Sequence, residues 1–243
     1  MQTMRRRFVA IAFLLAVLAS LSSGGSGRAG TDRAAKVVVI TSGVVPEEQK
    51  LGSGDYGYAE YGLVLRNQSS SRDAIDVTVE VEAVDGRGQS LTDGYSAITL
   101  IPAGADFVVS GALIWRGSTG LAGIETEVHV GQTKPRRRKL PAVKHASLTR
   151  SGGVIGSVTN PYKKPLPASA TIYGVVLDRQ GRIVAAGYDV TDAVTRPGAT
   201  VAFDIIGSST TVQPGSASSA KVSVDPCGYL AFTRACPVPG AQR

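Results

Sequence analysis

Catalysis near neutral pH most often relies on a histidine placed beside a nucleophile or a carboxylate, so the few histidines of this 243-residue chain come first. They are His129, in the segment TEVHV, and His145, in VKHASL. Both segments are typical of β-strands, and alternation places the His129 side chain on the face opposite Val128 and Val130. The chain contains no Gly-x-Ser-x-Gly motif. We therefore predict no catalytic residues and no enzymatic activity.

Carboxylates occur in two close pairs, Glu80 with Glu82 and Glu125 with Glu127. The members of each pair are two residues apart, so they share one face of a strand, and a solvated face is the simplest interpretation. A zinc site needs clustered cysteine or histidine, and a calcium loop needs several closely spaced oxygen ligands. Neither pattern is present in the sequence, so we expect no metal and no cofactor.

Positive charge gathers in the segment GQTKPRRRKLPA, where two prolines bracket a basic run. We call this run, with two lysines that follow it, the basic cluster: Arg136, Arg137, Arg138, Lys139, Lys163 and Lys164. Such a cluster could bind anionic envelope polymers or lipid head groups. The alternative is an exposed linker without a ligand. No aromatic residues interleave the run for base stacking, so we do not expect nucleic acid as a partner.

The N-terminus predicts export. Three arginines precede an uncharged apolar run from Phe8 to Leu21, and small residues follow it. This order is typical of a secretory signal peptide, which we place at residues 1–30. The mature protein would then be secreted or held in a bacterial cell envelope. The alternative is an uncleaved N-terminus that attaches the protein to a membrane.

Cleavage would also change the charge of the protein. It removes four of the 26 basic residues and no acidic one, so 22 basic against 19 acidic residues leave a net charge of +3 instead of +7. In an oxidising compartment, Cys227 and Cys236 are expected to form a disulfide. The loop-entropy model gives a loop of this size about 2.5–3 kcal/mol of stabilisation.

An internal repeat organises the chain. The segment VDGRGQSLTDGY at 84–95 recurs, 93 residues later, as LDRQGRIVAAGY at 177–188. Four identities lie in one register: Asp85 with Asp178, Gly88 with Gly181, Gly94 with Gly187, and Tyr95 with Tyr188. The common frame starts at Asn67 and Asn160 and continues, with one slip of a single residue, for about 65 residues. We infer two copies of one unit.

Each copy shows short segments with a period of two, separated by Gly, Pro and Asn turns. This pattern predicts an all-β protein of two tandem antiparallel β-sandwich, immunoglobulin-like domains after the signal peptide. We place the first domain at residues 31–133, a basic linker at 134–141, and the second domain, with the C-terminal disulfide loop, at 142–243.

Parts of both copies resemble the FxLYD domain. The matching pieces are NQSSSRDAIDVTVEVEAVDGRG with IPAGADF, and NPYKKPLPASATIYGVVLDRQG with RPGATVAF. The resemblance implies small immunoglobulin-like sandwiches of exported or envelope-anchored prokaryotic proteins, with an accessory or interaction role and no catalytic residues. We therefore expect a non-enzymatic module for protein interaction or structural spacing, whose partner is an envelope protein. The alternative is a binder of anionic wall polymers or lipids, and an enzyme with a site between the domains is the least favoured.

Overall fold

The computed structural model describes residues 34–47, 56–117, 120–136, 138–149, 152–205 and 217–227. Asp32–Arg243 forms one compact unit. The signal peptide predicted for residues 1–30 lies outside the described residues. In the part of the chain that is described, no helix has the length and apolarity needed to cross a membrane.

The described residues form twelve β-strands, so the predicted all-β fold is confirmed. We call residues 31–133 and 142–243 the first and second halves. The first half contributes β1 (Val37–Glu47), β2 (Tyr56–Asn67), β3 (Arg72–Asp85), β4 (Ser90–Ile101), β5 (Asp106–Arg116) and β6 (Leu121–Pro135). The second half contributes β7 (Ala142–Leu148), β8 (Val154–Thr159), β9 (Thr171–Leu177), β10 (Ile183–Val190), β11 (Thr200–Ile205) and β12 (Ser219–Asp225).

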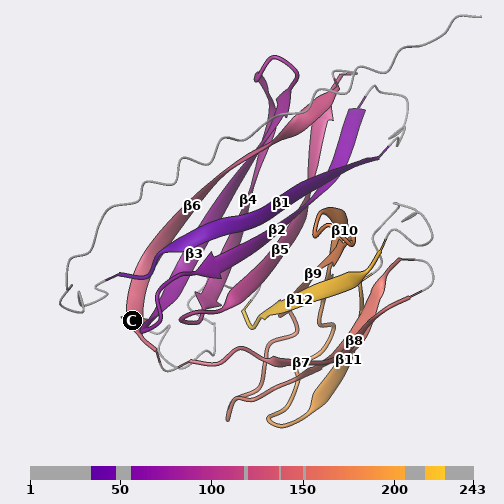
Figure 1. Cartoon of the computed structure of the whole chain (residues 1–243). Helices are drawn as coiled ribbons and strands as arrows, with labels where there is room; N and C mark the ends of the chain where they lie inside the picture. Colours follow the sequence, from indigo (N-terminus) through magenta and orange to yellow (C-terminus); the bar gives the residue numbers. More distant parts are fainter. Residues whose placement is uncertain are drawn as a thin grey trace, which may run out of the picture. The chain divides into compact units, whose positions relative to one another are not determined.

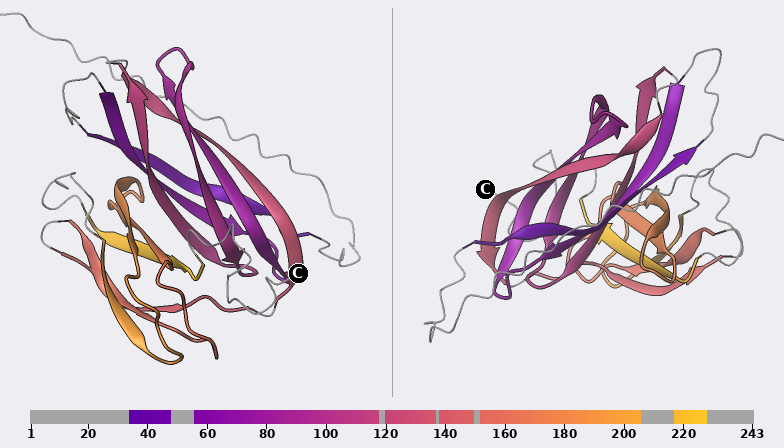
Figure 2. Two further views of the ribbon diagram at one scale, coloured as in Figure 1. Left: turned by 180° about the vertical axis from the view of Figure 1, so that it is seen from behind. Right: turned by 45° about the horizontal axis from the view of Figure 1, so that its top comes forward.

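The twelve strands build four antiparallel sheets of three strands each (Figures 1 and 2). In the first half the orders are β1-β2-β5 and β4-β3-β6, and in the second half they are β7-β8-β11 and β10-β9-β12. The second pair of sheets therefore repeats the strand order of the first pair. Facing sheets that enclose apolar side chains are the arrangement of a β-sandwich.

The turns that the sequence repeat predicts have the same hydrogen bonds in both halves. Asn67 and Asn160 are fully buried. The Asn67 side-chain amide donates to the carbonyls of Arg72 and Ile101, and its oxygen accepts from Ser69 N. The Asn160 side chain makes the equivalent three bonds in its own half. Each asparagine thus joins the end of one strand to two other segments.

The aspartates of the repeated glycine turns are also structural. The Asp85 carboxylate accepts hydrogen bonds from Arg87 N and Gln89 N at 2.8 and 2.9 Å. Asp178 accepts from the backbone amides two and four residues later in the same way. Gly88 and Gly181 adopt φ values of 74° and 78°, which side-chain-bearing residues rarely adopt. Both aspartates therefore stabilise their turns by accepting hydrogen bonds from turn amides.

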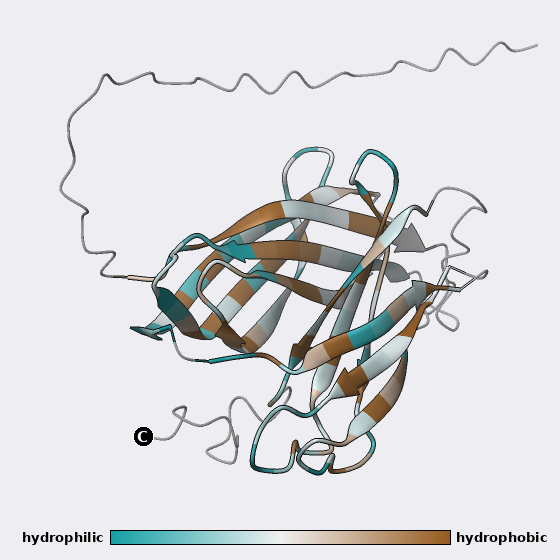
Figure 3. Ribbon diagram, turned by 60° about the horizontal axis from the view of Figure 1, so that its bottom comes forward, coloured by the Kyte–Doolittle hydropathy of each residue, from teal (hydrophilic) through white to brown (hydrophobic). Residues whose placement is uncertain are grey.

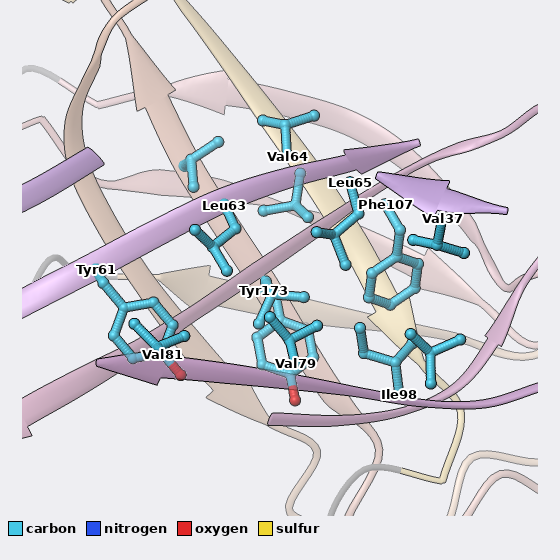
Figure 4. Close-up of a cluster of buried hydrophobic side chains, with 14 of the residues drawn as sticks. Val37, Tyr61, Leu63, Val64, Leu65, Val79, Val81, Ile98, Phe107 and Tyr173 are labelled. Atoms are coloured by element: carbon cyan, nitrogen blue, oxygen red, sulfur yellow. The ribbon is translucent and has the colours of Figure 1, made fainter. Parts of the chain in front are cut away.

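Alternation along β3 explains the core of the first half. Val77, Val79, Val81 and Ala83 have no exposed surface, whereas Glu80 between them is exposed. Buried and more exposed residues therefore alternate along most of β3, and Figure 3 shows apolar and polar bands that alternate along several ribbons. The inward side chains meet those of β2 and β5, including Leu63, Leu65 and Phe107, to form the main apolar cluster (Figure 4).

The second half adds to that same cluster. Every residue of β9 is buried, because the strand is covered on both faces. Ile172 and Val176 belong to a smaller cluster within the second half, whereas Tyr173, Val175 and Leu177 belong to the main cluster. The ring of Tyr173 meets Phe107 edge to face at a centroid distance of 6.3 Å. The two halves therefore share one apolar core.

Two glycines permit this contact. Gly43 and Gly62 are cross-strand partners on β1 and β2. A Cβ atom at Gly62 would lie 2.7 Å from Val175 Cγ1, and one at Gly43 would lie 2.7 Å from Ile183 Cβ. Carbon atoms pack at about 3.5–4.0 Å, so side chains at these two positions would push the sheets apart.

Side chains of strand β12 in the second half accept hydrogen bonds from backbone amides of the first half. Ser223 Oγ accepts a hydrogen bond from Val108 N at 2.9 Å, and the buried Asp225 carboxylate accepts one from Thr99 N at 3.0 Å. Val108 and Thr99 lie on β5 and β4, which each pair with one strand. These contacts satisfy amides at sheet edges that water or another chain would otherwise meet.

An ion-pair network also joins the halves. Arg66 binds the Asp106 carboxylate through two nitrogens at 2.7 and 3.1 Å, and Lys221 Nζ lies 3.1 Å from the same carboxylate. The hydrogen bond from Arg66 and the nearby Lys221 charge, which outweigh partial burial, hold the pKa of Asp106 below its ordinary value.

The structure differs from the sequence alignment in two places. Strand β6 continues to Pro135, so the first residues assigned to the linker belong to the strand. With its slip of one residue, the repeat frame would place Val224 at the position of Val130, but Val79 pairs with Val128 while its counterpart Ile172 pairs with Val224. The last strands are thus related by a shift of two further residues, which keeps the same side chains on the same face.

Candidate functional site

The outer face of the β4-β3-β6 sheet carries a concentration of carboxylates. We call it the acidic face, and it comprises Glu80, Glu82, Asp93, Glu125 and Glu127. The strand register aligns these residues in two adjacent rows across the sheet. One row is Asp93, Glu82, Glu125, and the next is Tyr95, Glu80, Glu127.

The acidic face is hollowed. An open depression of about 960 Å³ is lined by all five carboxylates together with Ser90, Tyr95, Thr126 and neighbouring residues. No lysine or arginine is among the described residues that line it. The prediction that Glu80 and Glu82 share a face opposite the apolar side chains agrees with the structure, as does the same prediction for Glu125 and Glu127.

His129 lies next in line on the same face. Its Nε2 atom is 3.3 Å from Glu127 Oε1 and 4.0 Å from Glu80 Oε1. The three side chains are more than half exposed, and one donor atom from each falls within 4.8 Å of the others. An imidazole nitrogen and two carboxylate oxygens could serve as three ligands of a zinc ion.

The fold places the residues of the basic cluster in different surroundings. Arg136, Lys139, Lys163 and Lys164 are exposed, and Arg137 lies outside the described residues. Tyr162 Oη donates to Lys139 O at 2.8 Å, so the linker lies beside the turn that carries Lys163 and Lys164.

Arg138 has a structural position instead. Its NH1 atom lies 3.7 Å from Oδ2 of the fully buried Asp73, and its backbone N donates to the same oxygen at 3.2 Å. The other Asp73 oxygen accepts from Ala103 N. Arg138 therefore anchors the linker to the first half, while the ligand-binding role of the other basic residues stays a prediction.

His145 lies on β7 at a register irregularity and has a positive φ of 56°. It lines an open hollow of about 600 Å³ with Ser157, Asp189 and Asp204. Ser157 Oγ donates to Lys144 O, and the Asp189 carboxylate accepts from backbone amides. Among the residues described around this hollow, no serine or aspartate is hydrogen-bonded to His145, so they form no nucleophile–base pair.

Cys227 is fully buried, and its backbone N donates to Asp225 Oδ1. Cys236 lies outside the described residues, so the disulfide between the two stays a prediction.

Comparison with known proteins adds no assignment, because no protein-family model and no curated protein sequence matches the chain. The function is therefore inferred from the sequence and from the geometry of the structure.

Sequence reasoning found the glutamate pairs but missed the acidic face that they build. The pairs are separated by more than forty residues, and their alignment depends on the strand register. The one signal available was that both pairs lie in strands predicted for the same half of the chain.

Proposed function

We propose that the protein is an exported, non-enzymatic interaction module built from two tandem immunoglobulin-like β-sandwiches. One observation carries the proposal: the central strand β9 of the β10-β9-β12 sheet is buried on both faces, because this sheet packs on the first half. In the second half, the outer face of this sheet is thus already a docking surface for the first half of the same chain. Sheet faces and edges are common surfaces for protein recognition.

Several features support the finer parts of this proposal. The recurrence of strand order and of the Asn67 and Asn160 hydrogen bonds supports a duplicated unit. The order of charges and apolar residues at the N-terminus supports export. The resemblance to FxLYD domains supports an accessory role in a bacterial envelope, and export in turn supports a disulfide between Cys227 and Cys236.

A second candidate function is binding of anionic envelope polymers or lipids. The hydrogen bond from Tyr162 to Lys139 favours it, because it holds two exposed basic segments side by side. The basic residues concerned are Arg136, Lys139, Lys163 and Lys164. Arg138 is left out because Asp73 holds it.

The test is binding of the purified full chain to an envelope fraction of the organism that produces it, across a salt series. The comparison variant carries Arg136→Gln, Lys139→Gln, Lys163→Gln and Lys164→Gln, and keeps Arg138 so that its ion pair with Asp73 is preserved. If the partner is a protein, binding should persist in the variant and should be lost when the envelope fraction is treated with protease.

Two other results would change the conclusion. Binding that fades with salt, vanishes in the variant and survives protease treatment would establish the polymer or lipid function instead. No saturable binding to any part of the envelope would refute the interaction module.

A further inference from the structure

We propose that the acidic face docks a lysine- and arginine-rich segment of a partner protein, an inference that rests on the proposed interaction function. It names the surface and the chemistry of the partner. This face has a counterpart in the second half, the outer face of the β10-β9-β12 sheet.

The register relates the two faces row by row. Asp93, Glu82 and Glu125 occupy the positions of Ala186, Val175 and Lys221. Tyr95, Glu80 and Glu127 occupy the positions of Tyr188, Tyr173 and Ser223. The backbone pattern is the same, and the side chains differ in chemistry.

The counterpart residues form an interface inside the chain. Val175 packs against the glycine at position 62, Tyr173 meets Phe107, and Ser223 binds the backbone of β5. Even the one charged counterpart is used, because Lys221 pairs with Asp106 of the first half. In the second half this sheet face therefore binds another protein surface, whereas in the first half it is open.

Charge identifies what the open face can bind. Like charges that face each other directly across a sheet are destabilising, and the row of Asp93, Glu82 and Glu125 places three carboxylates in that arrangement. Of the ion pairs that the described residues form, none joins these three side chains to a lysine or arginine. A cationic segment would replace this repulsion with ion pairs.

The shape of the site favours a protein segment over a single ion. The depression of about 960 Å³ and its two carboxylate rows have room for several cationic side chains. Tyr95 is 65% exposed and pairs with Glu80 across the strands. An arginine could bind the Glu80 carboxylate and stack on the Tyr95 ring, a combination common at protein interfaces.

The test measures binding of a short fluorescent peptide of alternating arginine and threonine to the full chain. The site variant carries Glu82→Gln and Glu125→Gln. The matched control carries Asp192→Asn and Asp204→Asn, which remove two exposed negative charges from the second half. We expect the dissociation constant to rise about tenfold or more in the site variant and to change little in the control.

Three outcomes would overturn the inference. Equal losses of peptide affinity in both variants would mean that net charge alone attracts the peptide. No saturable peptide binding, combined with zinc chloride binding that disappears in His129→Gln, would make the face an ion site. Capture of an envelope protein that is unchanged in the Glu82→Gln and Glu125→Gln variant would refute this surface while leaving the interaction function intact.

Discussion

Replacing Gly62 with alanine should destabilise the folded protein, because the added methyl group forces the two halves apart. The new Cβ would lie 2.7 Å from Val175 Cγ1, 3.1 Å from Ala186 Cβ and 3.3 Å from Ile183 Cγ2. These atoms belong to short or stiff side chains, so the added methyl group cannot be accommodated by a rotamer change alone. Overpacking of this kind costs about 1–3 kcal/mol.

The unfolded state reduces this cost slightly. Alanine restricts the unfolded chain more than glycine does, which offsets about 0.4–1 kcal/mol. The free energy of unfolding should therefore fall by about 1–2 kcal/mol, and the melting temperature by about 2–8 °C for a protein of this size. Urea denaturation and thermal melting of the full chain measure both quantities.

Gly123→Ala is the matched control. Gly123 lies on β6, and a Cβ atom there would meet nothing within 4 Å. This variant should be neutral or slightly more stable. A double mutant of Gly62→Ala with Val175→Ala should lose less stability than the sum of the single mutants, by about 1 kcal/mol, because the smaller residue makes room. If Gly62→Ala matched the control, or if the two changes were additive, the shared core would be refuted.

Three further predictions concern charged groups. Glu82→Gln should raise the free energy of unfolding by about 0.2–1 kcal/mol by removing cross-strand repulsion, and added salt should shrink the gain measured in urea. The pKa of Asp106 is lowered in the folded state, so its ion pair with Arg66 stabilises the protein above the ordinary carboxyl pKa, and this contribution is lost as the pH falls through the lowered pKa. Asp106→Asn should therefore cost about 0.5–1 kcal/mol at pH 7, and the difference from the wild type should vanish in acid titration. Asp73→Ala should cost about 3 kcal/mol, because it removes the buried partner of Arg138, and limited proteolysis should then cleave the linker faster.

Local features could be predicted from the sequence because they depend on neighbouring residues. The segment AVKHASL was expected to be a strand, and β7 spans Ala142–Leu148. The turns at Asp85 and Asp178 were expected because glycines follow these residues between two strand-like segments. The His129 side chain was expected on an exposed face because it alternates with valines, and it is more than half exposed.

Features that join distant segments could not be predicted in this way. The repeat identified the inward positions of β9, since these match the valines of β3. It did not show that Tyr173 and Val175, at the positions of Glu80 and Glu82, would be buried against the first half. The contact of Arg138 with Asp73 joins residues 65 positions apart, and the basic run gave no sign of it.

The difference between the outer faces of the β4-β3-β6 and β10-β9-β12 sheets also affects whether the protein associates with itself. In the second half, an apolar face of this sheet packs on the β1-β2-β5 sheet of the first half. An equally apolar face in the first half could pack on the β7-β8-β11 sheet of another molecule, and head-to-tail contacts of this kind extend into an open filament wherever the rotation between copies does not close a ring. Carboxylates at Glu80, Glu82 and Asp93 prevent this, because burying them against an apolar sheet would leave their charges without partners. The same charges that attract a cationic segment therefore keep the unit from extending, so sedimentation should show no association that grows with concentration, and assembly through this face would contradict the argument.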